Sequence, residues 1–233
     1  MAQWFEQKFS GGGIRHPHRR KKVSSNWSYT SILIGINVAA FILFFIFLGS
    51  VNESVLVSWI ALMPAIVLTG NHLWTFVTSM FMHGNLTHLF VNMLSLMFIG
   101  NFVEKLIGKN RFLWLYFGGG IFAGVFFVLI ALATGNDLNV YAVGASGAIF
   151  ALGGLLAVLT PRLPVLVFFI IPMPMWAAMG FLMLGLWLIS ASFGLPIGNI
   201  AHLGGLVVGL GYGFYLKNKY PRKTEMIGKY FSR

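Results

Sequence analysis

Six apolar segments, each about long enough to cross a membrane, dominate this chain of 233 residues. A helix that spans a bilayer needs about 20 mostly apolar residues, and a run that long in an ordinary domain is rare. Apolar residues make up 58% of the sequence and charged residues only 9%, which excludes a typical soluble domain. The expected fold class is an all-α membrane protein, a bundle of six transmembrane helices. We predict the spans at residues 29–49, 86–104, 112–134, 144–160, 174–193 and 199–217.

The basic residues predict how this bundle is oriented. All sixteen lysines and arginines fall on one side of a six-span arrangement, whereas the opposite side carries only Glu53 and Asp137. Because cytoplasmic loops are enriched in Lys and Arg, both termini are expected in the cytoplasm of a multi-pass protein of the cell membrane. The net charge of +11 is therefore mainly a topology signal. Membrane lipids are expected partners, and nucleic acid is not, since no folded basic domain would present the charge.

The regions around the bundle are expected to be simple. Residues 1–28 form a basic tail that we expect to be flexible, residues 29–217 form the membrane domain, and residues 218–233 form a second basic tail. The long external stretch 50–85 is apolar and rich in aromatic residues, so it is expected to lie half-immersed against the bundle. The chain has no cysteine, which excludes disulfides and thiol nucleophiles.

Four polar residues are predicted at one depth of the membrane. Spans two, four and six all start on the external side, which places His88 and Asn92, Ser146, and His202 near their first turns. Polar groups inside a membrane are costly and commonly mark a functional site. Because the topology was built from charge and hydropathy alone, this clustering independently indicates a site that opens to the external face.

Ser146 and His202 are the parts needed for nucleophilic catalysis. A serine hydroxyl needs a base to remove its proton during attack, and a histidine suits that task near neutral pH. None of the five acidic residues is placed to orient the histidine, so a dyad is expected. Alternatively, Ser146 is a small residue that permits close helix packing and His202 is a buried histidine bonded to a carbonyl.

Glycines near these residues predict close contact between spans four and six. Gly205 and Gly209 repeat at four-residue spacing on the face of span six that carries His202, and Gly147 begins a similar face on span four. Small residues let membrane helices approach closely, which would bring a short serine side chain to the histidine. Gly144 supplies backbone freedom where the external loop turns into span four. The Ser146 N–H, at a helix start, is expected to be free to bind an oxyanion.

These segments together resemble the rhomboid family of intramembrane serine proteases, in its minimal six-span form. The resemblance covers residues 29–217 and rests on the motifs His83-Gly84-Asn85, His88-Leu89-Phe90-Val91-Asn92, Gly144-Ala145-Ser146-Gly147 and Ala201-His202-Leu203-Gly204-Gly205, with Glu104 and Gly209. It implies an endopeptidase that cleaves single-span membrane proteins near the external face, with no cofactor and no metal. It also implies an oxyanion hole from His88, Asn92 and Gly144, and a lateral gate at span five, which follows Pro172 and Pro174.

Two positions depart from the family pattern. Thr75 follows Trp74 where the family usually has arginine, and Phe150 stands where many relatives have tyrosine, although a phenylalanine still allows ring packing against His202. His83 is expected to bond to loop backbone, and Glu104 is expected to form an ion pair near Lys105 and Arg111.

The assigned residue roles and the protease class each have alternatives. For His88 and Asn92 the alternative to catalysis is hydrogen bonding between helices that stabilises the bundle. A zinc protease would need a His-Glu-x-x-His motif, and an aspartyl protease would need two intramembrane aspartates, neither of which is present. A transporter would distribute polar groups through the membrane depth. A catalytically inactive rhomboid-like protein that clamps membrane helices is disfavoured, because both Ser146 and His202 are retained.

Overall fold

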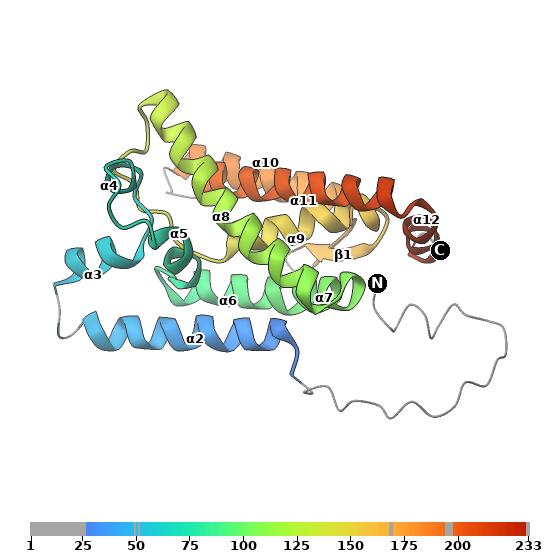
Figure 1. Ribbon diagram of the computed structural model, residues 1–233, viewed down its shortest axis with the longest axis horizontal. Coiled ribbons are helices and arrows are strands. Elements are labelled where there is room, and N and C mark those ends of the chain that lie inside the picture. Colours follow the sequence, from blue (N-terminus) through green and yellow to red (C-terminus); the bar gives the residue numbers. More distant parts are fainter. Residues whose placement is uncertain (1–26, 49, 51, 168–169, 194–197, 232–233) are drawn as a thin grey trace.

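The computed structural model describes residues 27–48, 50, 52–167, 170–193 and 198–231, and it is almost entirely helical (Figure 1). The first half of the chain contains α2 (Tyr29–Leu48), α3 (Glu53–Ile60), α4 (Pro64–Val67), α5 (Thr75–Thr78), the 3-10 turn η1 (Ser79–Phe81), α6 (Leu86–Ser95), the π-helical turn η2 (Leu96–Gly100) and α7 (Asn101–Ile107). The second half contains α8 (Lys109–Thr134), α9 (Ser146–Leu159), β1 (Pro164–Val167), β2 (Ile171–Pro174), α10 (Met175–Phe193), α11 (Asn199–Lys219) and α12 (Pro221–Tyr230). The predicted flexible tail falls almost wholly outside the described residues.

Four helical segments among the described residues are long and apolar enough to cross a membrane: α2, the continuous run Leu86–Ile107, α8 and α10. The other two predicted spans correspond to α9, which is apolar but has only 14 residues, and to α11, which has 21 residues. The helix ends lie within a few residues of the predicted boundaries. The helical class and the membrane character expected from the sequence are therefore confirmed.

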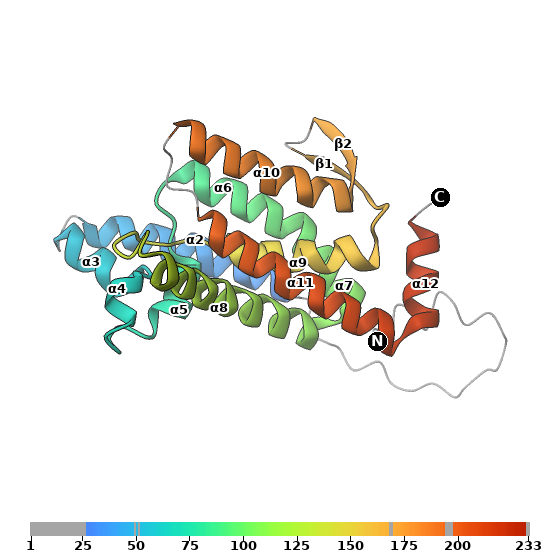
Figure 2. The ribbon, with the colours of Figure 1, turned by 90° about the horizontal axis from the view of Figure 1, so that it is seen from above.

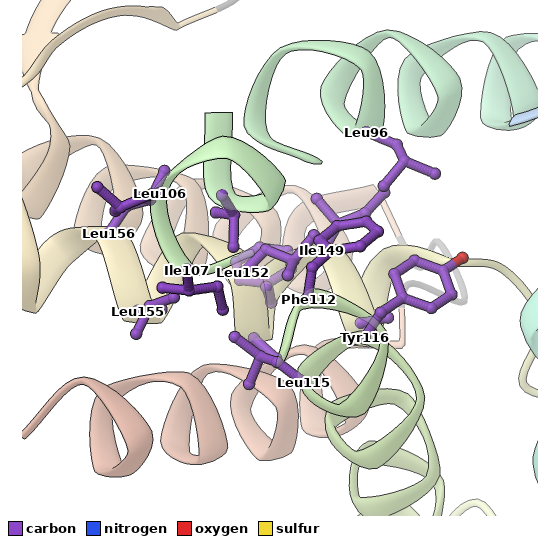
Figure 3. Close-up of a cluster of buried hydrophobic side chains, with 14 of the residues drawn as sticks. Leu96, Leu106, Ile107, Phe112, Leu115, Tyr116, Ile149, Leu152, Leu155 and Leu156 are labelled. Atoms are coloured by element: carbon purple, nitrogen blue, oxygen red, sulfur yellow. The ribbon is translucent and has the colours of Figure 1, made fainter. Parts of the chain in front are cut away.

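Helix α9 lies at the centre of the bundle. It contacts α8, α10 and α11, and α6 and η2 also pack on it, while α2 lies outside against α6 and η2 (Figures 1 and 2). Every α9 residue except Ser146, Ala157 and Val158 is buried. Figure 3 shows its leucines, including Leu152, packed among apolar side chains of α7 and α8. A helix that is apolar all round is expected in such a central position.

The two ends of the bundle differ in chemistry. One end, which we call the site end, carries α3, α4 and α5 together with the start of α9 (Figure 1). The other, which we call the basic end, carries the α7–α8 junction, the β1–β2 hairpin and α12 (Figure 2). The described lysines and arginines, from Lys105 to Lys229, occur in or next to the segments at the basic end.

Glu104 does not form the ion pair expected with Lys105 and Arg111. Its carboxylate accepts hydrogen bonds from the backbone N–H groups of Tyr29 and Thr30, at 3.0 and 2.9 Å, and from the Thr30 hydroxyl at 2.8 Å. These are free N–H groups at the start of α2, where the helix dipole also favours a negative charge. The expected ion pair was wrong because the free N–H groups of this helix start stabilise a buried carboxylate more than the side chains of Lys105 and Arg111 would.

Two further elements at the basic end were not anticipated. The run before span five forms a two-stranded antiparallel hairpin in which Pro164 pairs with Pro174 and Val167 with Ile171. Prolines lack an N–H and are tolerated at strand starts and edges, so they do not prevent this pairing. The C-terminal basic tail contains α12, which begins with Pro221 and buries Thr224 and Ile227.

Candidate active site

Ser146 and His202 lie side by side at the site end. Ser146 is the first residue of α9, His202 is in the first turn of α11, and 2.8 Å separates the serine Oγ from the histidine Nε2. The ring of Phe150 stacks on the imidazole with 4.7 Å between ring centroids and 16° between planes. His202 is buried and its Nδ1 has no hydrogen-bond partner among the described residues. The pair therefore has a serine, a base and a stacking ring, without a carboxylate on the far nitrogen.

Backbone contact between α9 and α11 sets this distance. A side chain at Gly205 would collide with the carbonyl of Gly147, and one at Gly209 would collide with the carbonyl of Ala151. On the opposite helix, a Cβ at Gly154 would lie 2.7 Å from the Leu206 carbonyl oxygen. The stripe of small residues thus has no space for a methyl group. Close approach of this kind is what small residues permit in membranes.

Gly144 takes a backbone conformation that favours glycine, two residues before Ser146. Its φ is +112°, and its N–H donates to the Ser79 carbonyl at 2.8 Å. Two further backbone hydrogen bonds, of 2.8 and 3.1 Å, join Leu62 and Ala142 and fix the same loop to the external stretch. These anchors have no signal in the sequence, because any residue can supply a backbone group.

The side chains of His88 and Asn92 converge on Gly144. A Cβ built there would lie 2.8 Å from His88 Nε2 and 3.6 Å from Asn92 Nδ2, so both groups face the loop that leads to Ser146. Asn85 caps α6 by accepting from the His88 N–H at 2.8 Å, which fixes the start of this helix. Asn92 Nδ2 donates to the His88 carbonyl of its own helix at 3.0 Å. No bond from Asn92 to another helix occurs among the described residues, which the stabilising alternative would require.

His83 packs against the ring of His88, with the Phe81 backbone as its partner in the loop. Its ring meets that of His88 edge-on at 5.0 Å between centroids, and only 1% of the residue is exposed. Burial is the largest cause that lowers the pKa of His83 to about 4, the neighbouring His88 lowers it further, and a hydrogen bond with the Phe81 backbone opposes the shift. This bond is long or bent, since neither ring nitrogen has a partner of good geometry among the described residues. At neutral pH His83 is therefore an uncharged ring packed against His88.

Thr75, which differs from the arginine expected at this position, is held by hydrogen bonding within its own loop. Thr75 is buried at the start of α5, and its hydroxyl donates to the His72 carbonyl at 2.6 Å. The neighbouring Trp74 donates from its indole N–H to the Trp59 carbonyl at 2.8 Å. A small hydrogen-bonded side chain thus fills this position.

Side chains that could bind a metal do not cluster in the part of the chain that the structure describes. The described residues contain no group of three or more His, Asp or Glu side chains that could hold a metal ion. None of the described carboxylates, Glu53, Glu104, Asp137 and Glu225, forms a hydrogen bond with the Ser146–His202 pair; Glu104 instead caps α2.

A family model described as "Rhomboid domain" matches residues 70–219, a range that includes all the residues of the site. A protein of Bacillus subtilis (strain 168) named "Rhomboid protease GluP" is 28% identical over 218 residues, which is 89% of this chain and 39% of that protein. "Rhomboid protein 1, mitochondrial" of Saccharomyces cerevisiae is 30% identical over 162 residues, 66% of this chain and 46% of that protein. "Inactive RHOMBOID-like protein 8" of Arabidopsis thaliana is 36% identical over 88 residues, 37% of this chain and 23% of that protein. The chain spans less than half of the length of these relatives.

The contact between α9 and α11 predicts that two glycines of α11 differ in how much their substitution destabilises the protein. Gly209→Ala places a methyl group against the Ala151 carbonyl, so we expect the free energy of unfolding to fall by about 1–3 kcal/mol, as for other overpacked sites. Gly211→Ala is the matched control, since a Cβ there meets nothing within 4 Å and alanine favours a helix. Thermal unfolding of both variants in the same detergent measures the difference. Equal melting temperatures of the two variants would show that a methyl group at position 209 does not destabilise the contact between α9 and α11.

Proposed function

Because the family model covers well over half of its residues, this chain belongs to the rhomboid family, and we propose that it is an active intramembrane serine endopeptidase. Members of this family are generally intramembrane serine proteases. The observation that carries the proposal is the 2.8 Å contact between Ser146 Oγ and His202 Nε2 in an apolar bundle. Within the described residues, neither side chain makes another hydrogen bond that would explain its presence there.

The proposed reaction begins with proton transfer from serine to histidine. Ser146 Oγ attacks the carbonyl carbon of the substrate peptide bond while His202 Nε2 takes the hydroxyl proton. The imidazolium then gives this proton to the departing amine, which leaves an acyl group on Ser146. A water molecule, deprotonated by His202, hydrolyses the ester and restores the serine. Stacking on Phe150 holds the imidazole plane in place of a hydrogen bond to Nδ1.

The oxyanion of the tetrahedral intermediate needs donors beside Ser146. The Ser146 N–H lies at a helix start without a side-chain cap, and the His88 ring and the Asn92 amide face the adjacent Gly144. Donors positioned in advance and shielded from water stabilise developing charge strongly. His88 and Asn92 are therefore assigned to the oxyanion hole, and Gly144 to the backbone turn that leaves room for them.

The proposed substrates are single-span membrane proteins, cleaved near the external face. Helix α10 is the proposed lateral gate, because Met175, Ala178 and Met179 near its start are its only buried residues. Met175 and Met179 pack on Gly153 of α9, while the residues after Met179 are half-buried or exposed. A substrate helix must partly unwind before its peptide bond can be attacked, since a helix satisfies all its backbone groups internally. Both termini are assigned to the cytoplasm by the basic residues.

An inactive rhomboid-like protein that binds membrane helices is the second candidate. One relative carries "inactive" in its name, so membership of the family does not by itself establish activity. The paired Ser146 and His202 favour catalysis, because a helix clamp needs neither a nucleophile nor a base.

The dyad predicts complete loss of cleavage in either single variant. Ser146→Ala and His202→Ala, reconstituted in liposomes with a panel of single-span substrates, should each lose at least about 1,000-fold in rate. The double variant should be no slower, because the two residues act as a unit. Ser54→Ala, which changes an exposed serine of α3, is the control. Substantial cleavage by purified Ser146→Ala would overturn the assignment of the nucleophile.

The oxyanion assignment predicts an effect on rate without an effect on binding. Asn92→Ala should lower kcat by about 10- to 1,000-fold and leave KM nearly unchanged. Asn101→Ala is a matched control, since Asn101 makes the same kind of bond, to the Met97 carbonyl at 2.6 Å, far from the site. An Asn92 variant that keeps its kcat but melts earlier would instead indicate a stabilising role.

A further inference from the structure

A groove runs between α8 and α11 toward the basic end of the bundle. Its volume is about 370 Å³, within the range of about 300–1,000 Å³ typical of ligand sites. Apolar and aromatic side chains line it, among them Trp114, Leu115, Val208 and Tyr212, and Arg111 lies at its end. The groove is separate from the Ser146–His202 pair, which lies at the opposite end of α11.

The groove is open because α8 lacks a side chain at Gly118. A Cβ at this position would meet nothing within 4 Å, whereas one at the adjacent Gly119 would collide with Ala151 of α9. Trp114, one turn before Gly118, is 80% exposed on the flank that faces lipid in a membrane. A tryptophan near a helix end is typical of the membrane interface. The groove is thus reached from the bilayer.

Two cations contact tyrosines instead of acids near this end of the groove: Arg111, which lines it, and Lys219, at the end of α11. The Arg111 guanidinium lies over the Tyr220 ring, 5.7 Å from its centroid. Lys219 Nζ donates to the Tyr215 hydroxyl at 2.7 Å and lies 5.2 Å from the centroid of that ring. Lys219 Nζ also lies over the Tyr220 ring, 5.9 Å from its centroid, so one ring is shared by the two cations. Their positive charge is therefore concentrated at one point.

The described part of the chain offers no carboxylate to neutralise this point. Glu104 is occupied by the start of α2, and Glu225 pairs with Lys229 at 2.7 Å. Glu53 starts α3 and Asp137 follows α8, so both are at the site end. Among the described residues these cations therefore face no carboxylate, and an anion bound there could also accept hydrogen bonds from the tyrosine hydroxyls.

We propose that the α8–α11 groove binds an anionic phospholipid, with an acyl chain between Trp114 and Val208 and the phosphate at Arg111 and Lys219. Apolar lining joined to a cationic mouth matches the two halves of such a lipid. Basic pockets between helices on the cytoplasmic side are known to bind acidic head groups, and anionic lipids are concentrated in that leaflet. A zwitterionic lipid would bring its own cation toward two others, so it is disfavoured.

Native mass spectrometry of the full chain tests this proposal, with phosphatidylglycerol and phosphatidylcholine of identical acyl chains as probes. The wild type should retain one phosphatidylglycerol at least about tenfold more tightly than phosphatidylcholine, as a charge-assisted hydrogen bond would give. Arg111→Gln should lose this preference, and Arg111→Lys should restore part of it. Gly118→Leu, which adds a side chain at a groove position where a Cβ meets nothing within 4 Å, should weaken binding of both lipids.

Two control variants distinguish binding in the groove from general effects of charge and side-chain volume. Lys217→Gln removes a nearby cation that does not line the groove, and Gly211→Leu adds a side chain on α11 where a Cβ meets nothing. Both should bind phosphatidylglycerol like the wild type. Equal binding of the two lipids, or unchanged binding in Arg111→Gln and Gly118→Leu, would overturn the proposal. A dimer that Gly118→Leu dissociates would show that a second helix fills the groove, which also overturns it.

Discussion

The contact between the backbones of α9 and α11 is the constraint on which the rest of the site depends. Gly205 meets the Gly147 carbonyl and Gly209 meets the Ala151 carbonyl with no space for a methyl group. In a membrane the hydrophobic effect does not drive helices together, so dispersion and shape at such contacts hold them. A serine side chain is short, and it reaches the His202 imidazole only because the helices are this close.

The contact between α9 and α11 also brings the polar groups of the site together. Two neighbouring helix starts bring an uncapped N–H at Ser146 and a base at His202 to one point, while α6 adds His88 and Asn92 from the side. The bundle therefore gathers four polar groups at the site end, whereas the basic end has a different chemistry. There, cations contact tyrosines near the ends of α8 and α11.

The sequence predicted the parts of this fold that depend on periodicity and composition. Span positions follow from apolar runs, and the closeness of α9 and α11 follows from glycines at four-residue spacing, because both patterns are local. The hairpin at Pro164, the capping of α2 by Glu104 and the bond from Gly144 to Ser79 were missed. Each of these depends on backbone groups that meet across long stretches of chain. A sequence carries no residue-specific signal for such partners.

The rate at which a fluorophosphonate labels Ser146 tests the central claim most directly, because it reports the activated serine without any substrate. In Gly205→Leu the helices must separate, and a displacement of about 1 Å should slow labelling by about 100-fold relative to the wild type. Gly211→Leu, where a Cβ has open space, should label normally. If Gly205→Leu folds, inserts and labels at the wild-type rate, close packing of α9 and α11 does not set the reactivity of the serine.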